Sequence, residues 1–206
     1  GYILNSLGAG LIPTFGSTPG AGGGGIAEGR AKWGTNISYS LPGVNITGFT
    51  TGALVANYVF YFPIYVMSQV TLDQIALEVT TAGAASTTAR MGIYNASTDQ
   101  QPTTLVLDAG TVAVDAIAVK AITIDKVLAA GRYLLALNSD GAPTLRVAIG
   151  ANRYVQLGAA LGANQLYSMY AAQTYAAFPA TGLAWDGRDQ GAVAFYYKVF
   201  LRIATP

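Results

Sequence analysis

The chain has 206 residues, enough for one domain with a sizeable core. Only 10% of its residues are charged and its formal net charge is +1, against roughly 25% charged residues in an ordinary soluble domain. It has no Cys and no His, which excludes disulfides, thiol nucleophiles, imidazole bases and the usual zinc ligands. A chain of this kind has no positive field for a nucleic-acid backbone, so we expect no nucleic-acid partner.

Residues 1–50 are punctuated by Gly and Pro and keep no helical or strand period for long. Gly20, Gly22 and Gly25 spell G-x-G-x-x-G, but a dinucleotide site needs a preceding strand, a following helix and an acidic residue about twenty positions on. No carboxylate lies between Glu28 and Asp73. We therefore expect residues 1–50 to be an extended Gly-rich arm that docks on a partner, followed by a domain over residues 51–206.

The stretch ALVANYVFYFPIYVM (53–67) is largely apolar and lies within an uncharged run. A membrane-spanning helix needs about 20 mostly apolar residues and basic flanks. Asn57, Pro63 and the many aromatic and β-branched residues favour a buried strand instead. We expect no membrane insertion.

From residue 70 onward the pattern is typical of short strands joined by Gly, Pro, Asn and Asp. In residues 70–83, Ile75, Leu77 and Val79 fall on one face and Gln74, Glu78 and Thr80 on the other. Further strands are predicted at 89–95, 104–114, 119–125, 132–141, 144–150, 153–158 and 191–203. The fold class that this predicts is all-β, a jelly-roll-like antiparallel β-sandwich with a Gly-rich extended N-terminal arm.

A Tyr-rich segment, NQLYSMYAAQTYAAF (164–178), is compatible with an Ala-rich helix or an ordered loop, and we favour the loop. Tyr167, Tyr170 and Tyr175 would offer large contact area and a hydroxyl in such a loop, which suits polar or saccharide surfaces. The alternative is that these rings pack against the sandwich or a neighbouring subunit.

The densest charged cluster is WDGRDQ (185–190). One interpretation is an Asp-Gly turn with solvated or paired charges. The other is a sugar-contacting loop, in which Trp185 stacks on a pyranose ring while Asp186 and Arg188 bond its hydroxyls. Glu28 and Glu78 are the only Glu residues, and no pair of carboxyls has the spacing of a glycosidase. Neither NSDG (138–141) nor DGRD (186–189) has the alternating ligands of a calcium loop, so we expect no metal. Because the chain also lacks Cys, His and a pair of suitably spaced carboxyls, we expect it to be a non-enzyme with no cofactor.

The central run of the chain has five distinctive segments: the aromatic-Pro site at 60–63, VTLDQIALEVTTAG (70–83), ARMGIYNAS (89–97), LVLDAGTV (105–112) and LAAGRYLLALNSDGAPTLR (128–146). Together they resemble a module of tailed-bacteriophage structural proteins. Such modules occur in minor tail proteins, tail fibres and head fibres or spikes of phages and phage-like particles. The resemblance covers roughly two thirds of the chain, leaves residues 1–50 outside, and carries no catalytic signature.

This resemblance implies a virion surface component, commonly a homotrimer, that contacts a bacterial host outside the cell. The leading hypothesis is a receptor-binding domain that recognises host surface polysaccharide without catalysis, with residues 1–50 joining other virion structural proteins. The alternative is a purely structural fibre, decoration or spacer protein with no ligand of its own. A glycan hydrolase is a third hypothesis.

Overall fold

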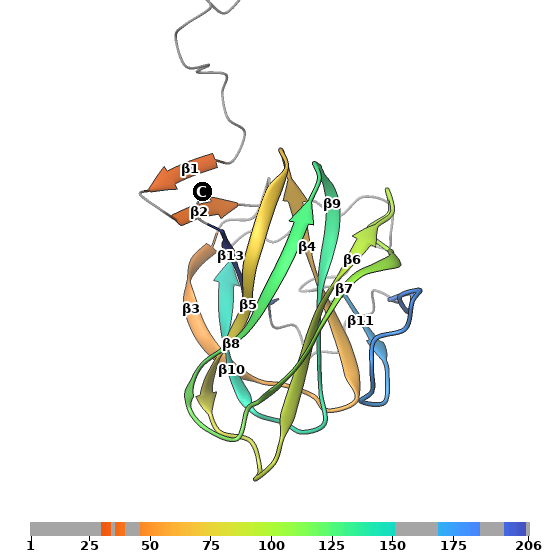
Figure 1. Cartoon of the computed structure of the whole chain (residues 1–206). Coiled ribbons are helices and arrows are strands. Elements are labelled where there is room, and N and C mark those ends of the chain that lie inside the picture. Colours follow the sequence, from red (N-terminus) through yellow and green to blue (C-terminus); the bar gives the residue numbers. More distant parts are fainter. Residues whose placement is uncertain (1–29, 34–35, 40–45, 151–168, 186–195, 205–206) are drawn as a thin grey trace, which may run out of the picture.

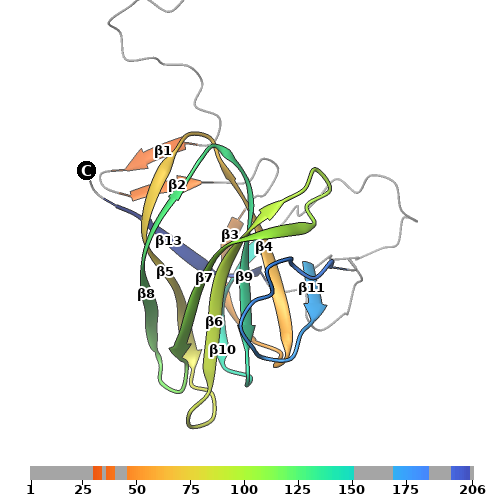
Figure 2. The same cartoon turned by 45° about the vertical axis from the view of Figure 1, so that its right-hand side comes forward.

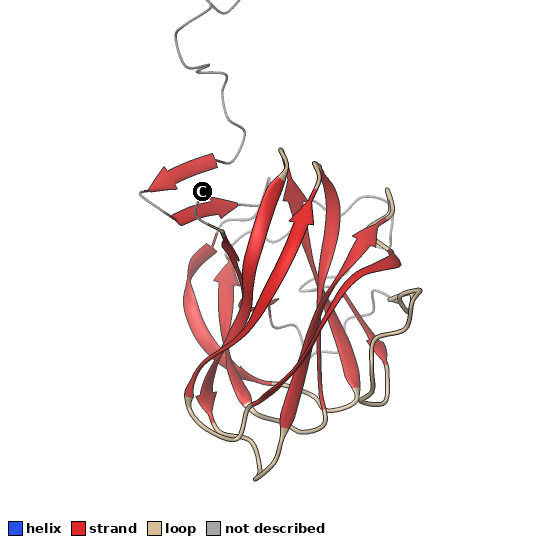
Figure 3. Cartoon of the chain, in the orientation of Figure 1, coloured by secondary structure: helices blue, strands red, loops and turns tan. Residues whose placement is uncertain are grey.

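The computed structural model describes residues 30–33, 36–39, 46–150, 169–185 and 196–204, and within these ranges the chain is all-β (Figures 1 and 3). The strands are β1 (Arg30–Trp33), β2 (Asn36–Tyr39), β3 (Ile46–Ala53), β4 (Tyr58–Val66), β5 (Val70–Thr81), β6 (Thr88–Ala96), β7 (Pro102–Ala113), β8 (Ala118–Leu128), β9 (Gly131–Ser139), β10 (Thr144–Gly150), β11 (Met169–Ala172), β12 (Tyr196–Tyr197) and β13 (Val199–Ile203).

Two antiparallel sheets form the body of the molecule, which confirms the predicted β-sandwich. The first sheet contains β3, β10, β12, β13, β5 and β8, and the second has the order β11-β4-β9-β6-β7. Among the strands that the structure describes, β1 and β2 pair only with each other. Because β3 begins at Ile46 and pairs with β10, the sheet starts before the predicted boundary between residues 50 and 51.

The main core lies between the two sheets, and β5 supplies its clearest pattern. Ile75, Leu77 and Val79 are no more than 1% exposed, as the alternation predicted. They pack with residues of the second sheet such as Met91 and Leu137, both fully buried. Alternation therefore fixes which face of β5 turns inward, because successive side chains of a strand point to opposite faces.

The C-terminal segment, predicted as one strand over 191–203, changes partner at Lys198. Strand β12 pairs with β10, and β13 pairs with β5. The Lys198 amide donates to the Arg146 carbonyl (2.9 Å), which keeps the segment attached at the interruption. Tyr197 is 3% exposed, and its hydroxyl donates to the Ala53 carbonyl (2.7 Å), so the partner change is held by a buried ring.

Strand β9, in the middle of the second sheet, is buried on both faces. In β9, every residue from Tyr133 to Ser139 is buried, and the outward Leu134 and Ala136 form a second cluster with Val59, Tyr61, Tyr94 and Phe178. Phe178 belongs to residues 173–185, which follow β11 in the chain. We call these residues the cover segment, because they pack on the outer face of this sheet (Figure 2). In residues 169–178 the chain forms β11 followed by irregular structure rather than a helix.

The apolar stretch 53–67 contains β4, which confirms the buried-strand interpretation. Pro63 lies opposite Leu134 of β9, while β11 pairs only with Tyr58–Tyr61 on the other side of β4. Pro is tolerated where one side of a strand has no ladder partner. No helix in the described part of the chain has the length and apolar character needed to cross a membrane.

Candidate ligand-binding surface around Trp185

Trp185 is fixed at the end of the cover segment by hydrogen bonds to a loop of the second sheet. Its indole Nε1 donates to the Gln100 carbonyl (2.7 Å). Its backbone N–H donates to Gln101 Oε1 (3.1 Å), and Gln101 Nε2 donates back to the Trp185 carbonyl (3.3 Å). The side chain of Gln101 thus makes the same two backbone hydrogen bonds to Trp185 that a neighbouring strand would make. Together with the bond to Gln100, they hold the half-buried indole in one orientation.

The loop that receives Trp185, residues 97–101, connects β6 to β7 and is closed on itself. Ser97 Oγ accepts from the amides of Asp99 (3.2 Å) and Gln101 (3.0 Å), a local side-chain-to-backbone motif that favours turns. Gln100 has a φ of 60°, in the left-handed region that tight turns use. The loop therefore presents Asp99, which is exposed, at a defined place.

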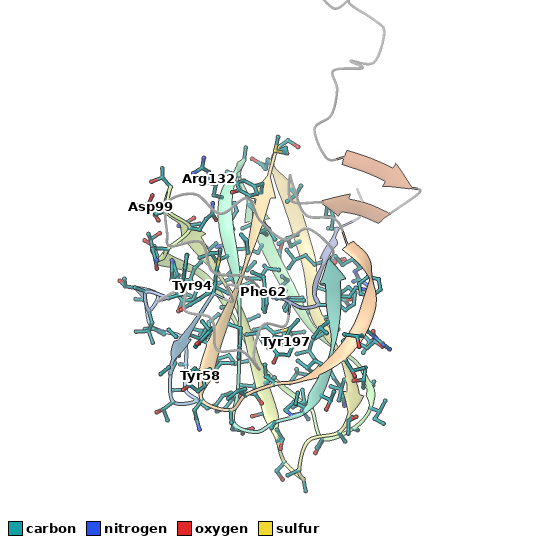
Figure 4. The ribbon with its side chains drawn as sticks, turned by 180° about the vertical axis from the view of Figure 1, so that it is seen from behind. Tyr58, Phe62, Tyr94, Asp99, Arg132 and Tyr197 are labelled. Atoms are coloured by element: carbon teal, nitrogen blue, oxygen red, sulfur yellow. The ribbon has the colours of Figure 1, made fainter. Side chains whose placement is uncertain are left out.

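Tyr65 and Arg132 lie beneath this loop, opposite each other on β4 and β9. The Arg132 guanidinium carbon is 5.9 Å from the centroid of the Tyr65 ring, within cation–π range. Gln100 Nε2 donates to the Tyr65 hydroxyl (2.7 Å), and Arg132 donates to the Thr98 carbonyl (3.4 Å). Figure 4 shows Asp99 and Arg132 at the same end of the molecule.

We call these five residues, Tyr65, Asp99, Gln100, Arg132 and Trp185, the Trp185 surface. It combines two aromatic rings with an exposed carboxylate and an exposed guanidinium. Rings stack on the apolar faces of flat ligands, while charged and amide groups bond hydroxyls. No three acidic side chains gather in the described ranges in a way that would hold a metal ion.

The cover segment reaches the Trp185 surface because polar groups along the second sheet hold its backbone. Asn57 Oδ1 accepts from the Tyr175 amide (3.0 Å), and Asp108 Oδ2 accepts from the Phe178 amide (3.2 Å). Farther along, the Gly182 amide donates to the Thr103 carbonyl (2.8 Å). These contacts join residues that are up to 118 positions apart in the sequence, so the surface exists only in the folded chain.

Asp108 holds the cover segment while it is itself paired. Its carboxylate accepts from Arg90 (2.7 Å), and both side chains are about one-fifth exposed, at 18% for Arg90 and 23% for Asp108. Beside this pair, Gly92 leaves space for Phe178, because a Cβ at Gly92 would lie 2.7 Å from the Phe178 ring. Burial raises the pKa of the nearby Tyr61 to about 12.

Three of the residues nominated from the sequence, Tyr170, Tyr175 and Trp185, are described by the structure, and they do not form one group. Tyr170 is 8% exposed and packs against Tyr58 and Phe60, so its ring serves the core. Tyr175 is half-buried and its hydroxyl accepts from Thr88 (2.8 Å). Figure 4 places Tyr58 far from the end of the molecule that holds Asp99 and Arg132. The Tyr170 ring contacts the Tyr58 ring, with centroids 5.7 Å apart, so Tyr170 lies far from that end too. Of the described nominees only Trp185 belongs to the Trp185 surface; the other three, Tyr167, Asp186 and Arg188, lie outside the described residues.

Sequence reasoning missed Tyr65, Asp99, Gln100 and Arg132. The composition of ASTDQQPT indicated a loop, but nothing local links that loop to Trp185, 85 positions away. Arg132 lies at the start of β9, and the next seven residues of that strand are all buried. In the sequence it resembles any charged residue at the end of an apolar strand, so nothing local marks it as part of a site.

Comparisons of the chain with protein-family models, with curated proteins and with solved structures found no match. The class that the structure defines is an all-β sandwich of two antiparallel sheets with one outer face closed by a cover segment.

Proposed function

We propose that this protein is a non-catalytic adhesion domain on the surface of a phage or phage-like particle, and that it binds a host-surface glycan at the Trp185 surface. The observation that carries the proposal is the fixed, half-buried indole of Trp185, which bonds to Gln100 in the loop that holds the exposed Asp99. Gln100 in turn bonds to Tyr65, whose ring lies under the exposed Arg132. A ring whose orientation is already set loses little conformational freedom when a sugar stacks on it.

Recognition would divide between the rings and the polar groups. Trp185 and Tyr65 provide stacking area, while Arg132 donates to, and Asp99 accepts from, the hydroxyls of the sugar. Asp186 and Arg188 follow Trp185 directly in the chain and would add further hydrogen bonds. Each contact is weak, and several copies on one particle would raise the overall affinity by effective concentration.

The order of the strands is compatible with this proposal. Without β11 and the C-terminal strands, the eight strands β3 to β10 follow the order β3-β10-β5-β8 in one sheet and β4-β9-β6-β7 in the other. We propose that this is a jelly roll, a double-sheet architecture found in viral capsid and lectin domains. The architecture itself assigns no function, so the Trp185 surface has to carry the assignment.

Binding of the intact protein to host-derived polysaccharides on a glycan array tests this proposal. We expect Trp185→Ala and Arg132→Gln each to weaken binding by about tenfold or more, a change of about 1.4 kcal/mol. Arg202→Gln is the matched control, because Arg202 is an exposed arginine on the other sheet, paired with Asp73 (2.7 Å). Equal binding by Arg132→Gln, Trp185→Ala and the control, with circular dichroism unchanged, would overturn the assignment.

A purely structural role is the second candidate, and the outer face of the first sheet favours it. Phe49 on β3 and Val119 and Val127 on β8 are 51%, 64% and 50% exposed at the two edges of this face, and exposed apolar side chains suit subunit contacts. Stable oligomers that bind no host surface would support this reading. The hydrolase hypothesis is discarded if host capsule incubated with the protein releases no oligosaccharide.

A further inference from the structure

Four strands form the edges of the two sheets in the described part of the chain: β3, β8, β7 and β11. Edge strands expose unpaired N–H and C=O groups, and proteins protect them with charges, Pro, bulges or short length. Strand β8 carries Lys120, Asp125 and Lys126, β7 has three register shifts against β6, and β11 has only four residues. Three of these edges are therefore protected.

Strand β3 lacks these protections over most of its length. Its sequence, ITGFTTGA, contains no charge and no Pro. After one irregularity near Ile46, the register with β10 is unbroken from Gly48 to Ala53. Phe49, Thr50, Thr51 and Ala53 are exposed. Figure 1 draws β3 at the margin of the molecule, and β10 is its one partner among the described strands.

The orientation of the β3 amides follows from one hydrogen bond. The Leu54 amide donates to the Pro143 carbonyl (2.8 Å), in line with the register that pairs Ala53 with Thr144. Amides of a strand point alternately to its two sides. The N–H groups of Gly52 and Thr50 therefore point toward β10, and those of Phe49, Thr51 and Ala53 point away from it.

We propose that β3 pairs antiparallel with β3 of a second copy of this chain, so that the first sheets of two protomers become one continuous sheet about a two-fold axis. The outward amides and carbonyls of Phe49 and Thr51 form the new ladder together with the outward amide of Ala53, because the Ala53 carbonyl already accepts from the Tyr197 hydroxyl. Such a contact is isologous and closes at two copies. It does not depend on glycan binding, which uses the opposite sheet.

A second copy fits this edge because the strand is neutral and complementary to itself. An antiparallel pairing of β8 with its own copy would bring Lys120 and Lys126 near like charges, whereas β3 has none to repel. In any antiparallel β3 pair, outward-pointing residues must face outward-pointing residues. Because the outward residues 49, 51 and 53 all have odd numbers, the two residue numbers of each facing pair add to the same even number. The residue at half that number therefore lies opposite its own copy in the second protomer. When the pairing is centred on the exposed stretch, this residue is Thr50 or Thr51.

The absence of Cys from the chain makes this register directly testable. Opposed Cα atoms in an antiparallel pair are about 4.5 to 5.5 Å apart, within the range that a disulfide spans. We expect oxidation to convert either Thr50→Cys or Thr51→Cys into a covalent dimer at a protein concentration where the control does not react. Thr123→Cys is that control, since Thr123 is exposed on the β8 edge of the same sheet.

Light scattering of the intact chain over a range of concentrations gives the second measurement. We expect a mass that rises from one chain to two, and a Kd at least tenfold weaker in Thr51→Glu. Within one protomer the introduced carboxylate would lie opposite Arg146. Across the two-fold axis it would lie near the same carboxylate of the second copy, and the two like charges would repel each other. Thr123→Glu should leave the Kd unchanged. A constant monomer, a trimer, or a dimer that neither Thr50→Cys nor Thr51→Cys crosslinks would overturn the pairing, the last by assigning the interface to another segment.

Discussion

Removing the ring of Phe178 is the most informative perturbation of the cover segment. Phe178 is 5% exposed and lies edge-on to Tyr94, with ring centroids 6.0 Å apart and an interplanar angle of 71°. Gly92, beneath it, leaves the space that the ring fills. Phe178→Ala keeps the backbone bond to Asp108 and deletes only the apolar contact, so it isolates what the ring contributes.

The expected loss follows from the size of the cavity. Phe→Ala in a core costs about 3–5 kcal/mol, of which the aromatic pair accounts for about 0.5–1.5 kcal/mol. In a chain of this length each kcal/mol lowers Tm by about 2–4 °C, so Tm should fall by about 6–20 °C. If the cover segment can open while the sandwich stays folded, the loss is limited to the free energy that keeps the segment closed.

Chemical denaturation and thermal unfolding followed by circular dichroism measure this loss. Leu183→Ala is the matched control, because Leu183 lies in the same segment but is 37% exposed, and it should cost less than half as much. Amide exchange at Gly182 and Trp185 tells local opening from global unfolding. A Phe178→Ala protein no less stable than Leu183→Ala would refute the view that this ring closes the outer face of the second sheet.

Three further predictions concern the same fold. A Cβ at Gly92 would lie 2.7 Å from Phe178, so Gly92→Ala should cost about 1–3 kcal/mol in urea unfolding, and unchanged stability would contradict the close contact. The hydrogen bond from Arg146 lowers the pKa of Glu78 in the folded chain. The ionised carboxylate therefore stabilises the fold fully above the unfolded pKa of about 4.3, and this stabilisation is lost as pH falls through the lower folded pKa. Glu78→Gln should therefore flatten the fall of Tm on acidification, and an identical acid limb would rule the pair out. Burial raises the pKa of Tyr61 to about 12, so its neutral form stabilises the fold below about pH 10 and this stabilisation is lost as pH rises toward 12; Tyr61→Phe should remove one late-titrating phenol from an absorbance titration.

Local alternation predicted most of the strands. In β5 the inward Ile75, Leu77 and Val79 could be read directly, because a half-buried strand has a period of two. The run YLLALNS (133–139) indicated a strand without indicating that both of its faces are covered. The predicted strand at 153–158 lies outside the described residues.

The candidate site was predicted only in part, and the reason is distance along the chain. Trp185 could be nominated because an indole beside charged residues is a recognisable sugar-binding composition. Its partners Gln100 and Gln101 are 85 and 84 positions away, and the Tyr65–Arg132 pair comes from two other strands. No local pattern encodes such contacts.

By itself the sequence determined the fold class, the inward face of β5 and the low charge of the chain, because these depend on residue type and on a period of two. Only the tertiary structure decided that residues 173–185 close the outer face of the second sheet, that β3 is left as an uncharged edge, and that Trp185 meets Gln100. These outcomes depend on which strands become neighbours, and strand order is set by packing of the whole chain rather than by any short segment of it.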